Sequence, residues 1–209
     1  MTGADDMTEP AAPGESPSES IELRDGAGRL LRHVRMHGGV PDGELVDYDE
    51  AGFVRARMTF RGGVLHGPAE FLKDGRPQLR MTYADGLLDG EVHSFDPGGR
   101  LSAVTRYAKG RRHGVTEAFG PDGKLLRVET WHDDRIEGEV LEYLAGGRLR
   151  ERQQWRGGLR DGETVTFDDT GRAKERTVYA AGVPTGSSES LTPPPPPAKR
   201  KRLRLPFLG

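Results

Sequence analysis

Two columns of glycine recur at a fixed spacing along the chain, and they constrain its fold more than any other feature. The first column is Gly43, Gly67, Gly90, Gly114, Gly138, Gly162 and Gly186, and the second is Gly28, Gly52, Gly75, Gly99, Gly123, Gly147 and Gly171. Neighbours in each column are 24 residues apart, except for one interval of 23 in each. Such a period is the signature of a repeat protein whose units stack on one another. One deleted residue explains both short intervals, and the first-strand rings place it between Gly67 and Phe71.

Each unit reads as a turn, a strand, a second turn and a second strand. The first turns have sequences such as GLLDG and GLRDG, and the second turns DPGGR and GPDGK. These are hairpin signals, because glycine adopts positive φ at low cost and Asn or Asp does so less easily. The pattern predicts an all-β fold, an elongated antiparallel sheet of consecutive hairpins with about 13 strands that span roughly 60 Å. Asp134 stands where other units have glycine, so the turn from Asp134 to Gly138 is expected to be irregular.

A large ring recurs near the end of every predicted strand. The first strands end on Tyr48, Phe71, Phe95, Phe119, Tyr143 and Phe167; the second strands end on Phe60, Tyr83, Tyr107, Trp131, Trp155 and Tyr179, with Met36 in the first unit. The residue six positions before each second-strand ring is apolar, for example Val54 before Phe60. An even separation places both on one face of a strand. We therefore interpret the rings as structural columns of a thin sheet.

Charged residues also recur in step with the repeat. Basic residues in the second strands are Arg29, Arg76, Arg100, Lys124, Arg148 and Arg172, with Arg57, Arg80, Arg152 and Arg176 further along; the first strands carry Glu44, Glu70, Glu91, Glu117, Glu139, Glu142 and Glu163. The net charge of the chain is only −2. Cross-strand ion pairs therefore explain the basic stripe better than binding to phosphates, and nucleic acid is not an expected partner.

The residues that could carry chemistry are few. The absence of cysteine excludes disulfides, thiol catalysis and cysteine-bound zinc. His66 and His113 occupy equivalent turn positions, but equivalent residues of adjacent units should lie about 9 to 10 Å apart, whereas zinc ligands lie about 2 Å from the metal. His132, Asp133 and Asp134 are consecutive and should point in different directions. We predict no metal site, cofactor, catalytic residue or small-molecule substrate, and hence no enzyme.

Composition divides the chain into four segments. Residues 1–20 form an acidic tail, predicted to be disordered; residues 21–186 form the repeat domain; residues 187–198 form a Pro-rich linker; residues 199–209 form a basic-apolar C-terminal tail. The acidic tail lacks the basic and apolar regions of a secretory signal, and no apolar run reaches membrane-spanning length. These features predict a cytoplasmic protein.

The basic-apolar tail breaks the repeat pattern and is a candidate docking peptide. It carries Lys199, Arg200, Lys201, Arg202, Leu203, Arg204, Leu205, Phe207 and Leu208. A basic and apolar segment behind a stiff proline spacer suits docking to a protein partner or to an anionic membrane surface. A disordered solubilising tail is the alternative interpretation.

Turns such as YADGLLDG, YAKGRRHG and WRGGLRDG, each followed by a strand that ends in Tyr or Phe, resemble the MORN repeat. They are most similar to its degenerate bacterial variant in YwqK-family proteins labelled as antitoxins. The resemblance covers about residues 21–186. The chain departs from the family pattern in its 24-residue spacing, in Asp134 and in Met36. The resemblance implies an elongated sheet of hairpins used as a scaffold for protein or lipid contacts.

Three functions fit these features. The first is a non-catalytic scaffold for protein–protein interaction with the C-terminal tail as a second docking element. The second is an antitoxin or immunity protein that neutralises a toxin by direct binding. The third is a peripheral membrane protein that binds anionic lipid through the basic tail.

Overall fold

The computed structural model describes residues 18–191, and this part of the chain contains strands and turns but no helix. The strands are β1 (Ser18–Arg24), β2 (Leu30–His37), β3 (Val40–Tyr48), β4 (Val54–Arg61), β5 (Val64–Lys73), β6 (Arg76–Ala84), β7 (Leu87–Leu88), β8 (Gly90–Phe95), β9 (Leu101–Ala108), β10 (Arg111–Phe119), β11 (Leu125–His132), β12 (Arg135–Ile136), β13 (Gly138–Tyr143), β14 (Leu149–Arg156), β15 (Leu159–Phe167), β16 (Ala173–Ala180), β17 (Val183–Pro184) and β18 (Glu189–Ser190). Every pairing is antiparallel, and all strands belong to one sheet.

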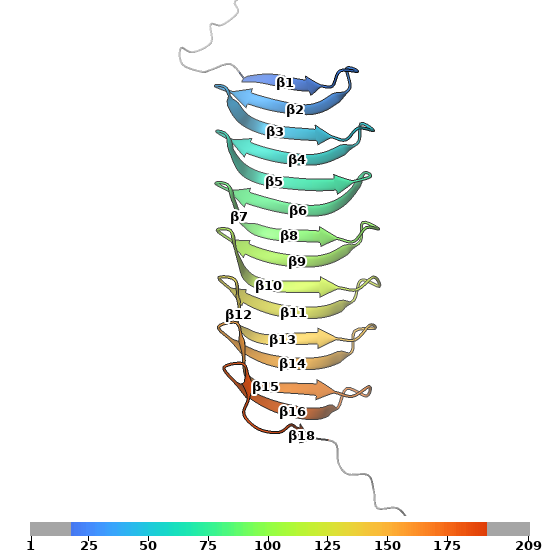
Figure 1. Ribbon diagram of the computed structural model, residues 1–209, viewed down its shortest axis with the longest axis vertical. Helices are drawn as coiled ribbons and strands as arrows, with labels where there is room; N and C mark the ends of the chain where they lie inside the picture. The colour runs from blue at the N-terminus through green and yellow to red at the C-terminus, as the bar shows by residue number, and fades with distance from the viewer. Residues whose placement is uncertain (1–17, 192–209) are drawn as a thin grey trace, which may run out of the picture.

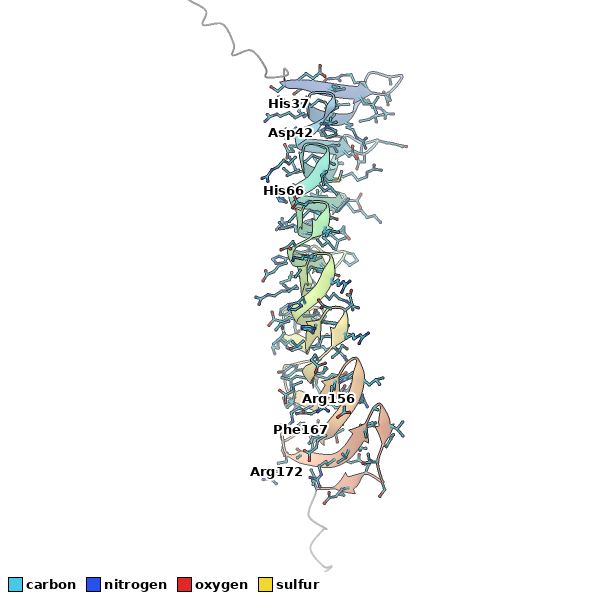
Figure 2. The ribbon with its side chains drawn as sticks, turned by 90° about the vertical axis from the view of Figure 1, so that its left-hand side faces the viewer. His37, Asp42, His66, Arg156, Phe167 and Arg172 are labelled. Atoms are coloured by element: carbon cyan, nitrogen blue, oxygen red, sulfur yellow. The ribbon has the colours of Figure 1, made fainter. Side chains whose placement is uncertain are left out.

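The sheet is a ladder of hairpins in chain order (Figure 1). This confirms the predicted fold class. The count of 18 strands exceeds the expected 13 because of β1 and the two-residue strands β7, β12, β17 and β18. Of these short strands, β7 and β12 are the first parts of first strands interrupted before Gly90 and Gly138. In Figure 2, turned by 90°, the ladder is a narrow column, as expected of a single layer of strands.

The sheet extends beyond the predicted repeat domain at both ends. β1 begins at Ser18, inside the segment assigned to the acidic tail, and β18 lies at Glu189–Ser190, inside the segment assigned to the linker. Residues 1–17 and 192–209 lie outside the described part of the chain. The predictions for the rest of the acidic tail, for most of the linker and for the docking residues Lys199–Leu208 fall there.

The two-residue turns that join second strands to the next first strands link neighbouring units. Their residues have positive φ, and the second residue donates its backbone N–H to a carbonyl of the previous unit, for example Gly110 to Leu88 at 2.8 Å and Gly158 to Ile136 at 2.9 Å. Asp134 keeps this geometry, with φ of 65° and a 3.1 Å bond from its N–H to the carbonyl of Arg112. The two-residue turn at Asp134 is therefore regular, because aspartate tolerates the left-handed region. The strand that follows is interrupted at Glu137, but it is interrupted in the same way at Asp89, after a turn that has the usual glycine, so the substitution by Asp134 is not the cause.

The turns inside each hairpin use a second device. In four units the turn opens with an aspartate, namely Asp25, Asp49, Asp96 or Asp168, whose Oδ1 accepts the N–H groups two and four residues later. At Asp96 these bonds come from Gly98 and Arg100, at 2.8 and 3.0 Å. Side-chain capping of this kind explains why Asp precedes the second glycine column.

The one-residue deletion lies in a turn, not in a strand. Leu72 pairs with Pro77 directly after a register shift, as Tyr48 pairs with Val54. Phe71 comes before the shift and lies between Ala56 and Leu79. Phe71 therefore does not belong to the first-strand ring column; Leu72 holds that position, and a short Asp74–Gly75 turn absorbs the deletion.

A register shift also changes the predicted faces of the second strands. In β4, Ala56 is opposite Asp47 and Val54 is opposite the next residue, Tyr48. Residues that are opposite each other on neighbouring strands share a face, and the adjacent residues Asp47 and Tyr48 point to opposite faces. Val54 and Ala56 therefore lie on opposite faces, although two residues of a regular strand at this separation would share one. The apolar residue six before each second-strand ring therefore packs against the first-strand column on the other face. The expectation that it shares a face with the second-strand ring was wrong.

We name the face that carries the second-strand rings the ring face, and its middle line of residues the central row. This row begins Val34, Leu45, Met58, Ala69 and Met81, each directly opposite the next. Further along it contains Thr105, Thr116, Glu129, Val140, Gln153, Thr164 and Thr177. Its first half is apolar and mostly buried, whereas its second half buries polar groups, with Gln153 only 1% exposed. The Gln153 oxygen accepts the indole N–H of Trp155 at 2.8 Å, which offsets the cost of this burial.

Candidate binding groove

A groove of about 660 Å³ lies on the face opposite the ring face, across β3 to β8. We name it the Thr59 groove. The side chains that line it on this face are Glu44, Arg57, Thr59, Pro68, Glu70, Arg80, Thr82, Glu91 and His93, and it is also bordered by Ala69 and Met81, which belong to the central row. Glu44 and Glu91 lie at its two ends, four strand spacings apart, which corresponds to about 19 Å. This length accommodates an extended stretch of several residues.

Small side chains form the hollow. Glu44 is opposite Thr59 and Pro68 is opposite Thr82, and the Thr59 hydroxyl donates to the Pro68 carbonyl at 3.0 Å. Thr59, Pro68 and Thr82 thus follow one another over three strands. The positions equivalent to Thr59 and Thr82 in other units include Arg35, Arg106 and Gln154, whose longer side chains lie beside Gly43, Gly114 and Gly162. An alignment of the repeats could have predicted the hollow, because Thr59, Pro68 and Thr82 are small at positions where other units often have long polar side chains.

Charged pairs line the groove beside these small residues. Arg57 Nη1 lies 3.4 Å from Glu44 Oε1, and Arg80 Nε lies 2.8 Å from Glu70 Oε1. Glu91 accepts from His93 Nε2 at 3.0 Å and from Arg106 Nη2 at 3.1 Å. The pKa of the Glu91 carboxyl is lowered; the hydrogen bond from His93 is the largest cause, and the hydrogen bond from Arg106 is the next. The groove therefore presents both signs of charge to a ligand.

These pairs belong to a series that extends along the sheet. Arg152 lies 3.8 Å from Glu139, and Arg176 lies 3.1 Å from Glu163. Four of the predicted glutamates of the first strands thus pair with the predicted arginines of the second strands, at Glu44, Glu70, Glu139 and Glu163. The expected cross-strand ion pairing is confirmed at these positions. Such exposed pairs stabilise a protein only slightly.

The basic residues that begin the second strands have another role. Five of the six reach a backbone carbonyl in the equivalent turn of the following unit: Arg29 to Glu50 at 3.0 Å, Arg76 to Pro97 at 3.5 Å, Arg100 to Pro121 at 3.2 Å, Lys124 to Gly146 at 3.4 Å and Arg148 to Asp169 at 2.9 Å. These side chains therefore connect successive units by hydrogen bonds to the turns at the edge of the sheet. The sequence predicted the stripe but not these contacts between units.

The turn column that contains His66 and His113 also joins successive units. His66, Asp89, Glu137 and Asp161 accept the N–H of the first positive-φ residue of the next unit, which is Asp85, Lys109, Gly157 and Ala181 respectively. Figure 2 shows His37, Asp42 and His66 in succession along this edge. The column therefore supplies acceptors for a turn that leaves one N–H without a partner in its own hairpin.

His113 and His132 come together, as the sequence did not predict. Their ring centroids are 4.9 Å apart, and His113 Nδ1 lies 3.5 Å from Asp133 Oδ1. Asp134 instead accepts from Arg112 Nε at 3.0 Å. From residue 18 to residue 191 no three His, Cys, Asp or Glu side chains form a group that could hold a metal ion.

All twelve predicted ring positions are half-buried. The Trp131 indole N–H donates to Glu129 at 3.1 Å, and guanidinium groups lie over several rings, with Arg80 at 5.3 Å from Phe95 and Arg112 at 3.6 Å from Trp131. Guanidinium groups thus lie over Phe95, Trp131, Trp155 and Tyr179. Within residues 18–191 no helix is long and apolar enough to cross a membrane.

No protein-family model matches the chain, and no curated protein matches it. Among solved structures, the chain is similar to a GtfA/B complex bound to UDP and GlcNAc, with 17% identity, a TM-score of 0.25, and coverage of 56% of this chain and 23% of that one. It is also similar to a point mutant of S. aureus TarM in complex with Fondaparinux, alpha-GlcNAc-glycerol and UDP, with 12% identity, a TM-score of 0.29, and coverage of 56% and 21%. The chain thus spans less than a quarter of either solved chain.

Proposed function

We propose that the protein is a non-catalytic scaffold that binds another protein in the Thr59 groove, with the C-terminal tail as a second docking element. The observation that supports this most is the groove itself, an open hollow about 19 Å long whose rims carry Glu44, Glu70 and Glu91 together with Arg57 and Arg80. An extended peptide with side chains of both charges can exchange these exposed intramolecular pairs for intermolecular ones. Because exposed pairs contribute little to folding, this exchange costs the scaffold little stability.

The groove suits binding better than catalysis. Hydrolytic chemistry needs a nucleophile next to a base that a third group orients. The Thr59 hydroxyl donates to a backbone carbonyl, and His93 lies on a carboxylate at one end of the groove. The single-layer sheet leaves this face open to a partner along its length (Figure 1).

A groove-filling substitution tests the proposal. Thr82→Arg places a long charged side chain in the hollow, and Thr130→Arg makes the same change at the equivalent, exposed position of another unit. Affinity purification from the native host with the full chain should recover a partner that Thr82→Arg loses and Thr130→Arg retains. Equal recovery by both variants would contradict binding in the groove.

A chain without residues 187–209 tests the second docking element. If the tail contributes, its removal should weaken capture of the partner without altering the sheet, as judged by far-ultraviolet circular dichroism. An unchanged set of partners would exclude the tail from the interaction.

Rescue of growth when the protein is co-expressed with a captured toxin would favour the antitoxin function over a general scaffold.

A further inference from the structure

The two ends of the sheet are finished differently. At the C-terminal end, β16 is partly covered by the short strands β17 and β18, of which β17 contains Pro184. At the N-terminal end, β1 pairs with β2 on one side, and no described strand pairs with its other side. All seven residues of β1 are exposed.

The free edge of β1 has neither lysine nor proline, and its three charged residues, Glu19, Glu22 and Arg24, are of both signs. Natural edge strands are usually short, or carry charged side chains (lysine above all), proline or a bulge. β1 is seven residues long with the sequence SESIELR, and its only register shift comes at its last step, between Leu23 and Arg24. Its outward backbone groups form a template for another strand.

The apolar core also reaches this edge uncovered. Ile21 is directly opposite Val34, so it continues the central row, and Leu23 lies on the same face. Ile21 is 43% exposed and Leu23 is 54% exposed, whereas Val34 is 8% exposed. One further strand at this edge would bury Ile21 as β1 buries Val34.

We propose that the strand at this edge is β1 of a second copy of the chain, paired antiparallel about a two-fold axis perpendicular to the sheet. The register centred on Ile21 places Ile21 opposite itself, Glu19 opposite Leu23, Ser20 opposite Glu22 and Ser18 opposite Arg24. In this register no two like charges are directly opposite, whereas the register centred on Glu22 makes two glutamates face each other. Arg24 Nη2 lies 2.6 Å from Glu22 Oε2, so the charge of Glu22 is compensated within its own chain.

The two-fold axis has a functional consequence. Because it is perpendicular to the sheet, both Thr59 grooves lie on the same face of one continuous sheet. The dimer would present two equivalent grooves to a partner that carries repeated binding segments, and simultaneous binding raises the effective affinity. Self-association does not depend on the proposed function of the groove.

Sedimentation equilibrium of the full chain tests the dimer. Ile21→Lys with Leu23→Lys puts charges on the exposed apolar positions and should weaken dimerisation at least about tenfold, because the burial of two apolar side chains is lost. Val183→Lys is the matched control, because Val183 is 65% exposed at the opposite end of the sheet. A wild-type chain that stays monomeric, or a dimer that Val183→Lys weakens as much, would overturn the proposal.

Disulfide trapping tests the register. Because the chain has no native cysteine, only the introduced cysteine can form a disulfide. Across the two-fold axis the Ile21 Cα atoms should be about 4.5 to 5.5 Å apart, within disulfide range. The two Arg24 Cα atoms should be about 20 Å apart. Ile21→Cys should therefore form a covalent dimer under mild oxidation and Arg24→Cys should not. Equal trapping, or none at Ile21, would exclude this pairing and favour an edge that takes a strand of another protein.

Discussion

The guanidinium carbon of Arg112 lies 3.6 Å from the centre of the Trp131 ring, which makes Arg112 part of the ring column. Arg112 is opposite Tyr107 in β9, so its side chain lies between two second-strand rings. The neighbouring units have Leu88 and Ile136 at the equivalent position. A cation thus replaces an aliphatic side chain without breaking the column, because its flat face packs on the indole.

We expect a double-mutant cycle with Arg112→Gln and Trp131→Leu to give a coupling free energy of about 0.5 to 1 kcal/mol. The cycle separates this contact from the bond between Arg112 and Asp134. Urea unfolding followed by circular dichroism provides the measurement. Arg111→Gln serves as the control, because adjacent residues of a strand point to opposite faces. A coupling no larger than that of the control would contradict a stabilising contact.

Two glycines of one turn allow the effect of backbone strain to be measured apart from the effect of steric crowding by a new side chain. Gly28 has φ of 81°, Gly26 does not have a positive φ, and a Cβ would meet no atom within 4 Å at either position. Gly28→Ala should cost about 1 to 2 kcal/mol, because L-residues are strained in the left-handed region. Gly26→Ala should be neutral or slightly stabilising.

Hydrogen exchange of the β1 and β2 amides measures this prediction locally, since terminal units of a repeat array open at lower free energy than central ones. Faster exchange in Gly28→Ala alone is the expected result. Similar exchange rates in the two variants would show that φ does not limit this turn.

The aspartates that open the hairpin turns predict acid sensitivity. Backbone hydrogen bonds from Arg29 and Arg100 are the main cause of the lowered pKa of Asp25 and Asp96, and a hydrogen bond from the Thr170 hydroxyl is the main cause at Asp168. A carboxyl whose pKa is lower in the folded state stabilises the fold above its unfolded pKa, and this stabilisation is lost as the pH falls through the folded pKa. The urea midpoint should therefore decrease below about pH 4.

Asp96→Asn isolates this effect in one turn. Asparagine keeps an acceptor oxygen but has no charge, so the variant should be less stable than wild type at pH 7 and should lose less on acidification. Urea titrations at pH 7 and pH 3 measure the difference. Parallel curves for the two proteins would show that Asp96 does not contribute to the acid sensitivity.

The sequence predicted the sheet because the constraint on its turns is local. A positive φ selects glycine in each unit, so the period could be counted directly. The position of the deletion could not be read in the same way, because Phe71 and Leu72 are both apolar and only the pairing of Leu72 with Pro77 assigns their faces. Asp134 was misjudged for a related reason, since its left-handed conformation is supported by a hydrogen bond to Arg112, which is distant in sequence.

The groove was harder to predict than the sheet. It depends on the absence of long side chains at Thr59, Pro68 and Thr82, and such an absence is visible only after strands are registered. The ion pairs around it were predictable as opposite charges on neighbouring strands. Their exact partners depended on register, so Arg57, which is opposite Glu70, instead forms its ion pair with Glu44.

The basic-apolar tail permits a direct test of the membrane function. Lys199, Arg200, Lys201, Arg202 and Arg204 would each contribute about 1 kcal/mol near an anionic surface, and Phe207 with the neighbouring leucines would add apolar contact. We expect the full chain to co-sediment with phosphatidylserine-containing vesicles at low salt and to be released as the Debye length falls to about 8 Å at physiological ionic strength. A chain that ends at residue 198 and vesicles of neutral lipid are the controls. Binding that persists without the tail would assign the lipid contact to the sheet, and no binding at low salt would leave the tail without a membrane role.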